Sequence, residues 1–189
     1  MAAPDDLVAV QLALGPDSPH AEVLAAVDAV LGADVPWVSR LAAVSGIVWR
    51  TLTGPVGVGI YASDPPRVRI VLAASQGAPA AMWFGWGKDI AGSAAAERVV
   101  QFVPAVRAFP GHRMTDRSVA ASVAVPITLR RVVLGVIEAR SASADDLGPV
   151  EAELVQGVAT RLATAWPAAW AAELPGAKPT TPNTREEQS

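Results

Sequence analysis

Two pairs of strand-like segments, each joined by a short turn, constrain the fold of this 189-residue chain more than any other feature. Val56–Ala62 is a short apolar run, an Asp-Pro-Pro sequence follows it, and residues 67–72 alternate between arginine and apolar side chains. This pattern predicts an antiparallel hairpin, because Asp and Pro favour turns and period-two alternation favours a half-exposed strand. Residues 122–129 and 132–140 predict a second pair of strands, joined by two arginines.

Helical patterns precede the strands. Ser18 is expected to cap a first helix that ends at Gly32, because a hydroxyl group can accept a hydrogen bond from a free N–H at a helix start. Apolar residues spaced by three and four predict a second helix over residues 36–52.

A further helical pattern follows the strands. Asp145 and Asp146 are expected to lie at its start, where carboxylates accept free N–H groups and suit the helix dipole. The helix is expected to run to Trp166 or, beyond a proline kink, to Trp170. Its predicted buried stripe consists of Leu147, Val150, Leu154, Val158 and Leu162.

The segment between the two strand pairs has weaker signals. Residues 75–92 are rich in Gly and Trp and predict a loop. A short helix is expected at residues 94–98, a short strand at 99–103 and a long irregular segment at 104–121. Antiparallel strands with helices at both ends predict an α+β domain with one layered core.

The chain divides into three parts by composition. Residues 1–20 are expected to form an N-terminal arm, residues 21–172 the folded domain, and residues 173–189 a disordered tail. The tail is assigned in this way because the residues after Pro175 are rich in Pro, Thr, Asn, Glu and Gln and include no apolar side chain able to anchor them.

Composition excludes several functions. Fifteen Lys and Arg against 18 Asp and Glu give a formal charge of −3, which is unfavourable for binding nucleic acid. Cysteine is absent, so thiol nucleophiles, disulfides and Cys-built metal sites are excluded. The two histidines, His20 and His112, lie far apart in sequence, and we expect neither a metal nor a cofactor.

Targeting signals are also missing from this sequence. The first basic residue is Arg40, whereas a signal peptide requires an early positive segment. No apolar stretch approaches the roughly 20 residues of a membrane-spanning helix. We therefore expect a cytoplasmic protein that does not bind a membrane.

One motif points to a known family. Residues 103–112 read Val-Pro-Ala-Val-Arg-Ala-Phe-Pro-Gly-His, which is very similar to the Val-x-x-Phe-x-Gly-His run of the free methionine-(R)-sulfoxide reductases, a branch of the GAF domains. Residues 76–77, 87–92 and 135–137 also fit, and the resemblance extends over residues 41–165. It implies a GAF-like antiparallel sheet flanked by N- and C-terminal helices, with a ligand cavity between the sheet and the long loops.

The resemblance does not extend to the catalytic cysteines. The position of the nucleophile is Thr115, and the two further cysteine positions are Ala81 and Ala91. A thiolate attacks the sulfoxide sulfur in that family, and neither a threonine hydroxyl nor an alanine can replace it. We therefore expect no reductase activity and no enzyme of this class.

The acidic residues of the family are changed as well. One glutamate position is Ser122, and a later Asp-x-Asp aligns with residues 138–140, where Glu138 is kept acidic and Arg140 is basic. Alternate residues of a strand face the same side, so Glu138 and Arg140 should point together toward the pocket. They could form a structural ion pair or contact a ligand.

Positions that match the cavity walls are the candidate ligand-binding residues. The family's neighbouring tryptophan falls on Gly57, while two tryptophans enrich the opposing loop and could act as lid packing or as ligand contacts. The candidates are Tyr61, Trp83, Trp86, Phe109, His112, Asp116, Ser122, Glu138 and Arg140.

Three functions are compatible with these residues. The first is a non-catalytic domain that binds a small molecule and signals through a partner protein or a dimer. The second is an interaction scaffold whose pocket is filled by Trp83 and Trp86. The third is an enzyme with altered chemistry that uses His112, Asp116 or Glu138 as acid or base.

The ends of the chain predict a homodimer. Trp166 and Trp170 extend the apolar stripe of the last helix, and alanines make the neighbouring surface small and flat. A twofold partner would bury this excess apolar surface. The alternative is that residues 7–14 fold back over the same surface within one chain.

Overall fold

The computed structural model describes residues 13–64, 67–78, 80–112 and 116–167. Within them lies a single antiparallel sheet of six strands with the order β3-β2-β1-β6-β5-β4. The strands are β1 (Pro55–Ser63), β2 (Arg69–Gly77), β3 (Trp83–Gly85), β4 (Gln101–Val103), β5 (Ala121–Leu129) and β6 (Val132–Ser141). The helices are α2 (His20–Leu31), α3 (Trp37–Thr51), α4 (Asp89–Glu97) and α5 (Pro149–Ala165). The expected α+β class is confirmed.

Both predicted hairpins are present and lie side by side. Strand β1 pairs with β2 and β5 pairs with β6, both antiparallel. The hairpins join through β1 and β6, where Ile60 is opposite Ile137. The apolar runs of the sequence therefore occupy the two central strands, which are covered on both faces.

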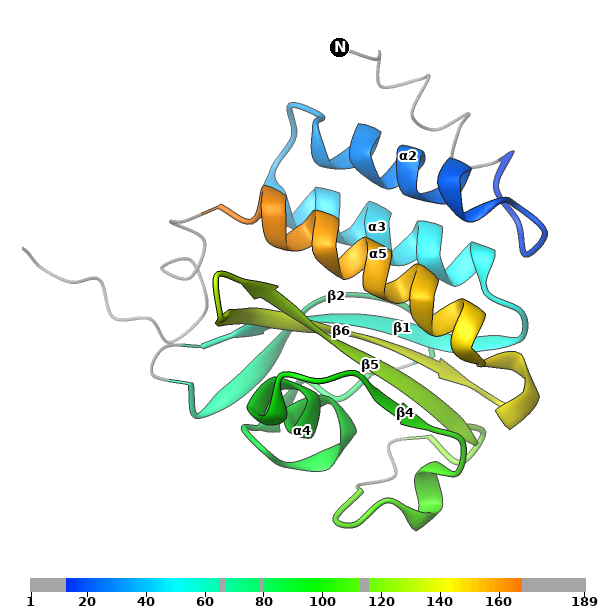
Figure 1. Ribbon diagram of the computed structural model, residues 1–189, viewed down its shortest axis with the longest axis vertical. Coiled ribbons are helices and arrows are strands. Elements are labelled where there is room, and N and C mark those ends of the chain that lie inside the picture. Colours follow the sequence, from blue (N-terminus) through cyan, green and yellow to red (C-terminus); the bar gives the residue numbers. More distant parts are fainter. Residues whose placement is uncertain (1–12, 65–66, 79, 113–115, 168–189) are drawn as a thin grey trace, which may run out of the picture.

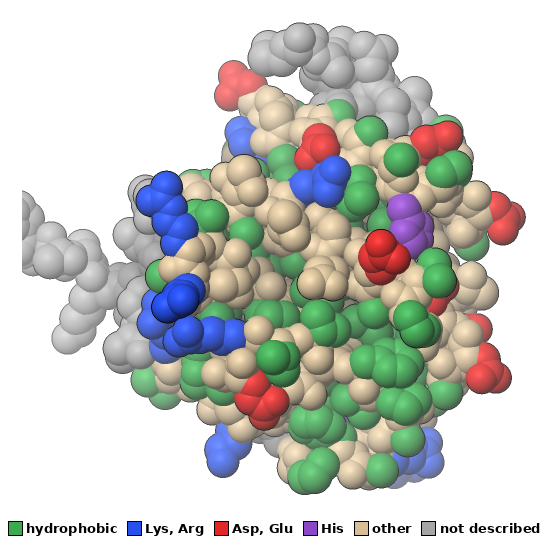
Figure 2. Space-filling model, viewed as in Figure 1, with side chains coloured by type: hydrophobic (Ala, Val, Ile, Leu, Met, Phe, Trp, Pro, Cys, Tyr) green, Lys and Arg blue, Asp and Glu red, His purple; other side chains and the backbone are tan. Residues whose placement is uncertain are grey.

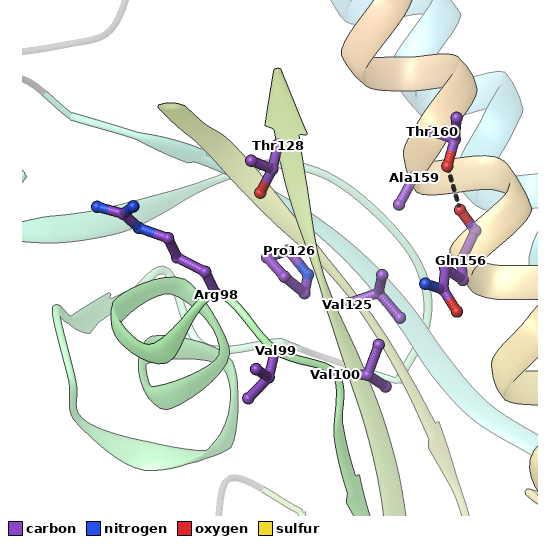
Figure 3. Close-up of a pocket in the computed structure, with 9 residues that line it drawn as sticks. All are labelled: Arg98, Val99, Val100, Val125, Pro126, Thr128, Gln156, Ala159 and Thr160. Atoms are coloured by element: carbon purple, nitrogen blue, oxygen red, sulfur yellow. Dashed lines mark hydrogen bonds between the residues drawn. The ribbon is translucent and has the colours of Figure 1, made fainter. Parts of the chain in front are cut away.

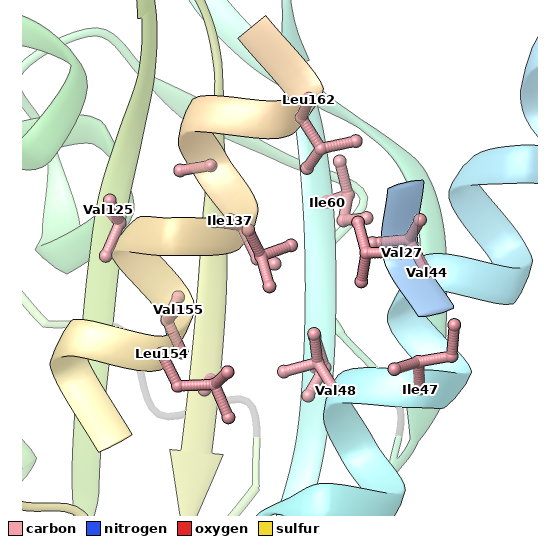
Figure 4. Close-up of a cluster of buried hydrophobic side chains, with 14 of the residues drawn as sticks. Val27, Val44, Ile47, Val48, Ile60, Val125, Ile137, Leu154, Val155 and Leu162 are labelled. Carbon is pink, nitrogen blue, oxygen red and sulfur yellow. The ribbon is translucent and has the colours of Figure 1, made fainter. Parts of the chain in front are cut away.

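Helices α3 and α5 cover one face of the sheet, and α2 packs over these two helices on the side away from the sheet (Figure 1). Alternation along the strands directs Ile60, Val125 and Ile137 toward these helices, where they meet side chains such as Val48 and Leu162 in one apolar core (Figure 4). Helix α2 packs on α5 so closely that a Cβ added at Gly157 would lie 3.1 Å from the methyl groups of Leu24. Helix α4 covers the opposite face of the sheet (Figure 1).

The Gly- and Trp-rich segment is more ordered than the sequence predicts. Strand β2 extends to Gly77, β3 follows at Trp83–Gly85, and α4 begins at Asp89 rather than Ala94. Strand β3 pairs with the start of β2, with Trp83 opposite Val71. The loop expected over residues 75–92 is therefore wrong, because pairing with β2 and packing of α4 on the sheet override the local glycine signal.

The groups that form hydrogen bonds near the starts of α2 and α5 differ from those expected. Ser18 Oγ accepts a hydrogen bond from Gly15 N at 3.0 Å, within the preceding turn, and no side chain caps α2. The two aspartates lie in a 3₁₀ turn at residues 144–146, before the start of α5 at Pro149. At the start of α5, Glu151 Oε2 instead accepts a hydrogen bond from Gly148 N at 2.7 Å. The two predicted caps are therefore wrong.

The last helix ends at Ala165 with Trp166 as its C-terminal cap, in agreement with the nearer of its two expected ends. Its buried stripe is narrower than predicted, because Val150 in its first turn is 59% exposed, whereas the other four stripe residues are buried. Trp166 packs edge-to-face on Trp37, with ring centroids 5.5 Å apart. Trp170 lies outside the described residues. Because α2 and Trp37 already cover part of α5 and its end, the surface left for a partner is smaller than the sequence implies.

Candidate functional site

A buried cluster of polar side chains lies on the face of the sheet that α4 covers. Tyr61 packs with the apolar residues of this face, and residues 138 and 140 share it because β6 alternates. Ser122 on β5 is paired opposite Arg140. Buried polar groups require partners, so their contacts define the chemistry of the site. The members are Tyr61, Asp89, His112, Ser122, Glu138 and Arg140.

Glu138 is buried and hydrogen-bonded. Ser122 Oγ donates to Glu138 Oε1 at 3.0 Å, and Glu138 is only 4% exposed. Burial raises the pKa of Glu138, because the charged form is poorly solvated; the nearby Arg140 and the Ser122 hydroxyl oppose this shift without cancelling it. The site therefore shifts Glu138 toward its protonated form relative to water, and the carboxyl oxygen accepts the hydrogen bond from Ser122.

Arg140 occupies the space above Gly57. Its Nη2 donates to the carbonyl oxygen of Ala78 at 3.1 Å, and a Cβ added at Gly57 would lie 2.6 Å from this nitrogen. A glycine at position 57 therefore leaves room for the guanidinium, where the resembling family has a tryptophan. The expectation that Glu138 and Arg140 share one face is confirmed.

Tyr61 is the largest polar side chain of the cluster and is fully buried. Its ring lies over Gly59, where an added Cβ would come within 2.9 Å of Cε2, and its centroid is 5.2 Å from that of Phe84. The hydroxyl makes no hydrogen bond to any described residue. Burial raises the pKa of Tyr61 and the nearby Glu138 raises it further, so the hydroxyl stays protonated and remains a donor.

Asp89 is the member of the site that sequence analysis missed. His112 Nδ1 lies 2.7 Å from Asp89 Oδ1, which also accepts a hydrogen bond from Ile90 N at 2.8 Å. Asp89 has a left-handed backbone with φ +60°, an unfavourable conformation for a residue with a side chain. An Asp in the first turn of a helix would have been a signal, but the predicted helix began five residues later.

The remaining candidates lie around this cluster. Trp83 is 47% exposed, and Trp86 and Phe109 are half-buried against the apolar residues beneath α4. Asp116 accepts hydrogen bonds from the backbone N and the Oγ of Ser118, at 2.8 and 2.7 Å. These bonds lower the pKa of Asp116, the backbone bond most, and engage its carboxylate in its own turn. Thr115 lies outside the described residues.

The arrangement suits recognition of a small polar molecule. Tyr61 and Arg140 supply donors, Glu138 and Asp89 supply oxygen atoms, and His112 can take either role depending on its tautomer. The chain has no cysteine, and Ala91, at one of the former cysteine positions, is fully buried. Among the described residues, no group of three His, Cys, Asp or Glu side chains could hold a metal ion. No described helix has the length and apolar character needed to cross a membrane.

Comparisons with known proteins agree with this geometry. The family model of the GAF domain matches residues 50–165. Protein YtsP of Bacillus subtilis is 28% identical over 94 residues, which are 50% of this chain and 58% of that protein. Protein ZMO0507 of Zymomonas mobilis is 30% identical over 112 residues, 59% of this chain and 66% of that protein. The matches therefore span less than two thirds of these curated relatives.

Solved structures show the same fold. A free methionine-R-sulfoxide reductase from Neisseria meningitidis, in complex with its substrate, is 25% identical with a TM-score of 0.73, covering 81% of this chain and 94% of that chain. A putative GAF sensor protein from Burkholderia vietnamiensis is 24% identical with a TM-score of 0.69, covering 77% and 94%. The GAF domain of a phosphoenolpyruvate-protein phosphotransferase from Coxiella burnetii is 14% identical with a TM-score of 0.72, covering 82% and 96%.

Proposed function

Because this chain belongs to the GAF domain family, we propose that it is a non-catalytic sensory domain that binds a small molecule and signals through a partner protein or a second copy of itself. GAF domains are typically ligand-binding sensory domains. The proposed ligand site is the polar cluster beneath α4, and its central residues are Tyr61, Glu138 and Arg140.

The main support for this proposal is the buried hydroxyl group of Tyr61. A buried hydroxyl without a hydrogen bond costs free energy, on the order of 1–3 kcal/mol. A ligand that accepts a hydrogen bond from Tyr61 would recover this free energy. The adjacent Glu138 and Arg140 side chains add charge and directional bonds, which are the groups that confer specificity in small-molecule sites.

The absence of catalysis is proposed on chemical grounds. The chain has no thiol, and the positions of the family's cysteines hold Thr115, Ala81 and Ala91. Reduction of a sulfoxide by the route of the free methionine sulfoxide reductases needs a thiolate to attack sulfur and a thiol to release the product. None of the side chains in the polar cluster can supply these two electrons.

One observation favours a scaffold with a filled pocket as a second candidate. Arg140 and Tyr61 lie directly over Gly57 and Gly59, so they occupy part of the space above β1. In this case the polar cluster would be structural and no ligand would enter. Of the two tryptophans expected to fill the pocket, Trp83 is 47% exposed, whereas Trp86 packs partly buried against the apolar residues beneath α4.

A thermal-shift screen separates the two candidates. We would measure the melting temperature of the whole chain with a panel of amino acids, carboxylic acids, nucleosides and methionine sulfoxide. The sensory proposal expects at least one compound to raise the melting temperature of the wild type and to raise that of Tyr61→Phe less. Ser118→Ala is the matched control, because it removes a hydroxyl outside the cluster. A uniformly flat screen, together with a native mass spectrum free of a bound molecule, would favour the scaffold.

A further inference from the structure

A groove of about 410 Å³ lies at the outer edge of β5, away from the polar cluster. One wall is the chain that leaves α4, with Arg98 and Val100, and the floor includes Pro126 and Thr128 of β5 (Figure 3). The other wall is the middle of α5 at residues 156–160. The groove thus spans the sheet edge between the two helical layers.

The edge of β5 in this groove carries no neighbouring strand. Strand β6 pairs with β5 along its whole length, but on the other side β4 pairs only with residues 122–124. Among the described residues, the later part of β5 therefore has no strand partner on the side that faces away from β6. Thr128 Oγ1 is buried and makes no hydrogen bond to a described residue. An unpaired strand edge with an unmatched polar group is a template for an added extended segment.

The surface around the groove is unusually apolar for an exposed edge. Val99 is 49% exposed, Phe102 44% and Leu129 41%. Figure 2 shows hydrophobic side chains gathered in the lower part of the view, where Figure 1 places β4 and β5. Val99 lines the groove itself, whereas Phe102 lies beside the start of β5 and Leu129 at its end.

Three arginines near the end of the groove that Thr128 lines have no acidic partner among the described residues. Arg98 lines the groove, and Arg130 and Arg131 follow β5 directly after Leu129. All three are exposed, and no carboxylate of the described residues lies within ion-pair distance of them. In a chain with a net charge of −3, this cluster is a local excess of positive charge.

The backbone at these arginines is also strained. Their φ angles are 60° at Arg98, 48° at Arg130 and 69° at Arg131, in the left-handed region that glycine and asparagine occupy more easily. Arg98 takes this conformation at the end of α4, and Arg130 and Arg131 take it in the two-residue turn between β5 and β6, so each has a structural cause.

We propose that this groove binds a short extended segment of a partner protein in which carboxylates alternate with apolar side chains. The apolar side chains would enter the groove beside Val100 and α5, and the carboxylates would pair with Arg98 and Arg130. A concave groove along a strand edge fits an extended chain better than it fits a flat lipid surface. Pro126 has no N–H to donate, so the pairing would be short. The inference does not depend on the ligand site beneath α4.

Fluorescence anisotropy with the full-length chain tests the proposal. The probe is a fluorescein-labelled octapeptide of alternating Val and Glu, compared with peptides of alternating Val and Gln and of alternating Val and Lys. We expect the Val–Glu peptide to bind best, and the double variant Arg98→Gln/Arg130→Gln to weaken it about tenfold. Arg117→Gln is the matched control, because Arg117 is also exposed but precedes the other end of β5, and it should change the affinity less than about twofold.

Changes in the NMR chemical shifts of backbone amides on peptide addition would locate the bound peptide. The proposal expects the largest shifts at Val99, Thr128 and Thr160, and it expects Tyr61→Phe to leave the peptide affinity unchanged, so that a failed ligand screen and a failed groove are distinguishable. Equal binding of all three peptides, or no binding, would overturn the proposal. Co-flotation of the protein with phosphatidylserine vesicles that depends on Arg98 and Arg130 would also overturn it. Contacts between the groove and residues 168–189 in the free protein would do the same.

Discussion

His112 Nδ1 lies 2.7 Å from Asp89 Oδ1, and this contact ties the segment after β4 to the first turn of α4. The Asp89 side chain is 4% exposed and that of His112 is 15% exposed, so the contact is shielded from water. Asp89 also holds the N–H of Ile90 with the same oxygen atom. The pair therefore anchors two segments that border the proposed ligand site.

Replacement of Asp89 tests this anchor. Asp89→Ala removes both hydrogen bonds and places alanine in a left-handed conformation, so we expect a loss of about 2–3 kcal/mol in the free energy of unfolding. Asp89→Asn tolerates the same backbone and keeps an oxygen acceptor, and should lose less. Urea unfolding at neutral pH measures both, with the exposed Glu153→Gln as a control. Equal stability of Asp89→Ala and the control would show that the contact contributes nothing.

Glu138 predicts a pH dependence of stability. Its pKa is raised in the folded protein above the ordinary value of 4.5, so the folded state holds a proton that the unfolded state releases first. This group therefore stabilises the fold fully below pH 4.5, and the contribution is lost as the pH rises through the folded-state pKa. Glu138→Gln keeps an acceptor for Ser122 and does not titrate.

Urea unfolding of both proteins across pH 4 to 8 checks this prediction. We expect the wild type to lose stability relative to Glu138→Gln as the pH rises, because only the wild type must bury a carboxyl that tends to ionise. A difference between the two proteins that is constant over this range would show that Glu138 titrates alike in the folded and unfolded states. A difference that changes in the opposite direction would show that Arg140 dominates the environment of the carboxyl.

Sequence signals that are local predicted most of the fold. Both hairpins followed from period-two alternation and turn residues, and the helix at Trp37–Thr51 followed from its apolar spacing. Strand β3 was missed because three residues are too few to show alternation. The start of α4 was missed because glycine and small residues mask its helical pattern, which only packing on the sheet resolves.

Part of the candidate site could likewise be predicted from local sequence patterns, and part of it could not. Alternation along β6 placed Glu138 and Arg140 on one face, because strand periodicity is fixed by the backbone. The contact between Asp89 and His112 joins residues 23 apart, and no local pattern encodes it. The space above Gly57 that Arg140 fills is likewise a tertiary feature, visible only when β1 and β6 are paired.

Methionine sulfoxide should not be reduced by this protein with any thiol donor. The reason is the absence of cysteine from the whole chain, which leaves no thiolate to attack the sulfoxide. Thr115→Cys alone should not restore activity, because the positions of two family carboxylates hold Ser122 and Arg140. Assays with dithiothreitol and with a thioredoxin system, each read against a reaction without protein, decide this. Turnover above that background by the wild type would contradict the non-catalytic proposal.

Trp166 distinguishes packing within one chain from packing between two chains. Its ring meets Trp37 edge-to-face at 5.5 Å, and Trp37 is only 8% exposed. We therefore expect Trp37→Ala to cost about 3 kcal/mol in the free energy of unfolding and Trp166→Ala about 2 kcal/mol, since Trp166 is half-buried. The double variant should cost less than the sum, because the two rings interact directly.

Light scattering on the same variants tests the proposed homodimer. If the tryptophans pack within the chain, Trp166→Ala lowers the unfolding free energy and leaves the measured mass of the wild type unchanged. If Trp166 instead anchors a dimer, the variant falls from twice 19.5 kDa to 19.5 kDa at micromolar concentration. A wild type that already measures 19.5 kDa would reject the dimer altogether and leave a partner protein as the route for the signal.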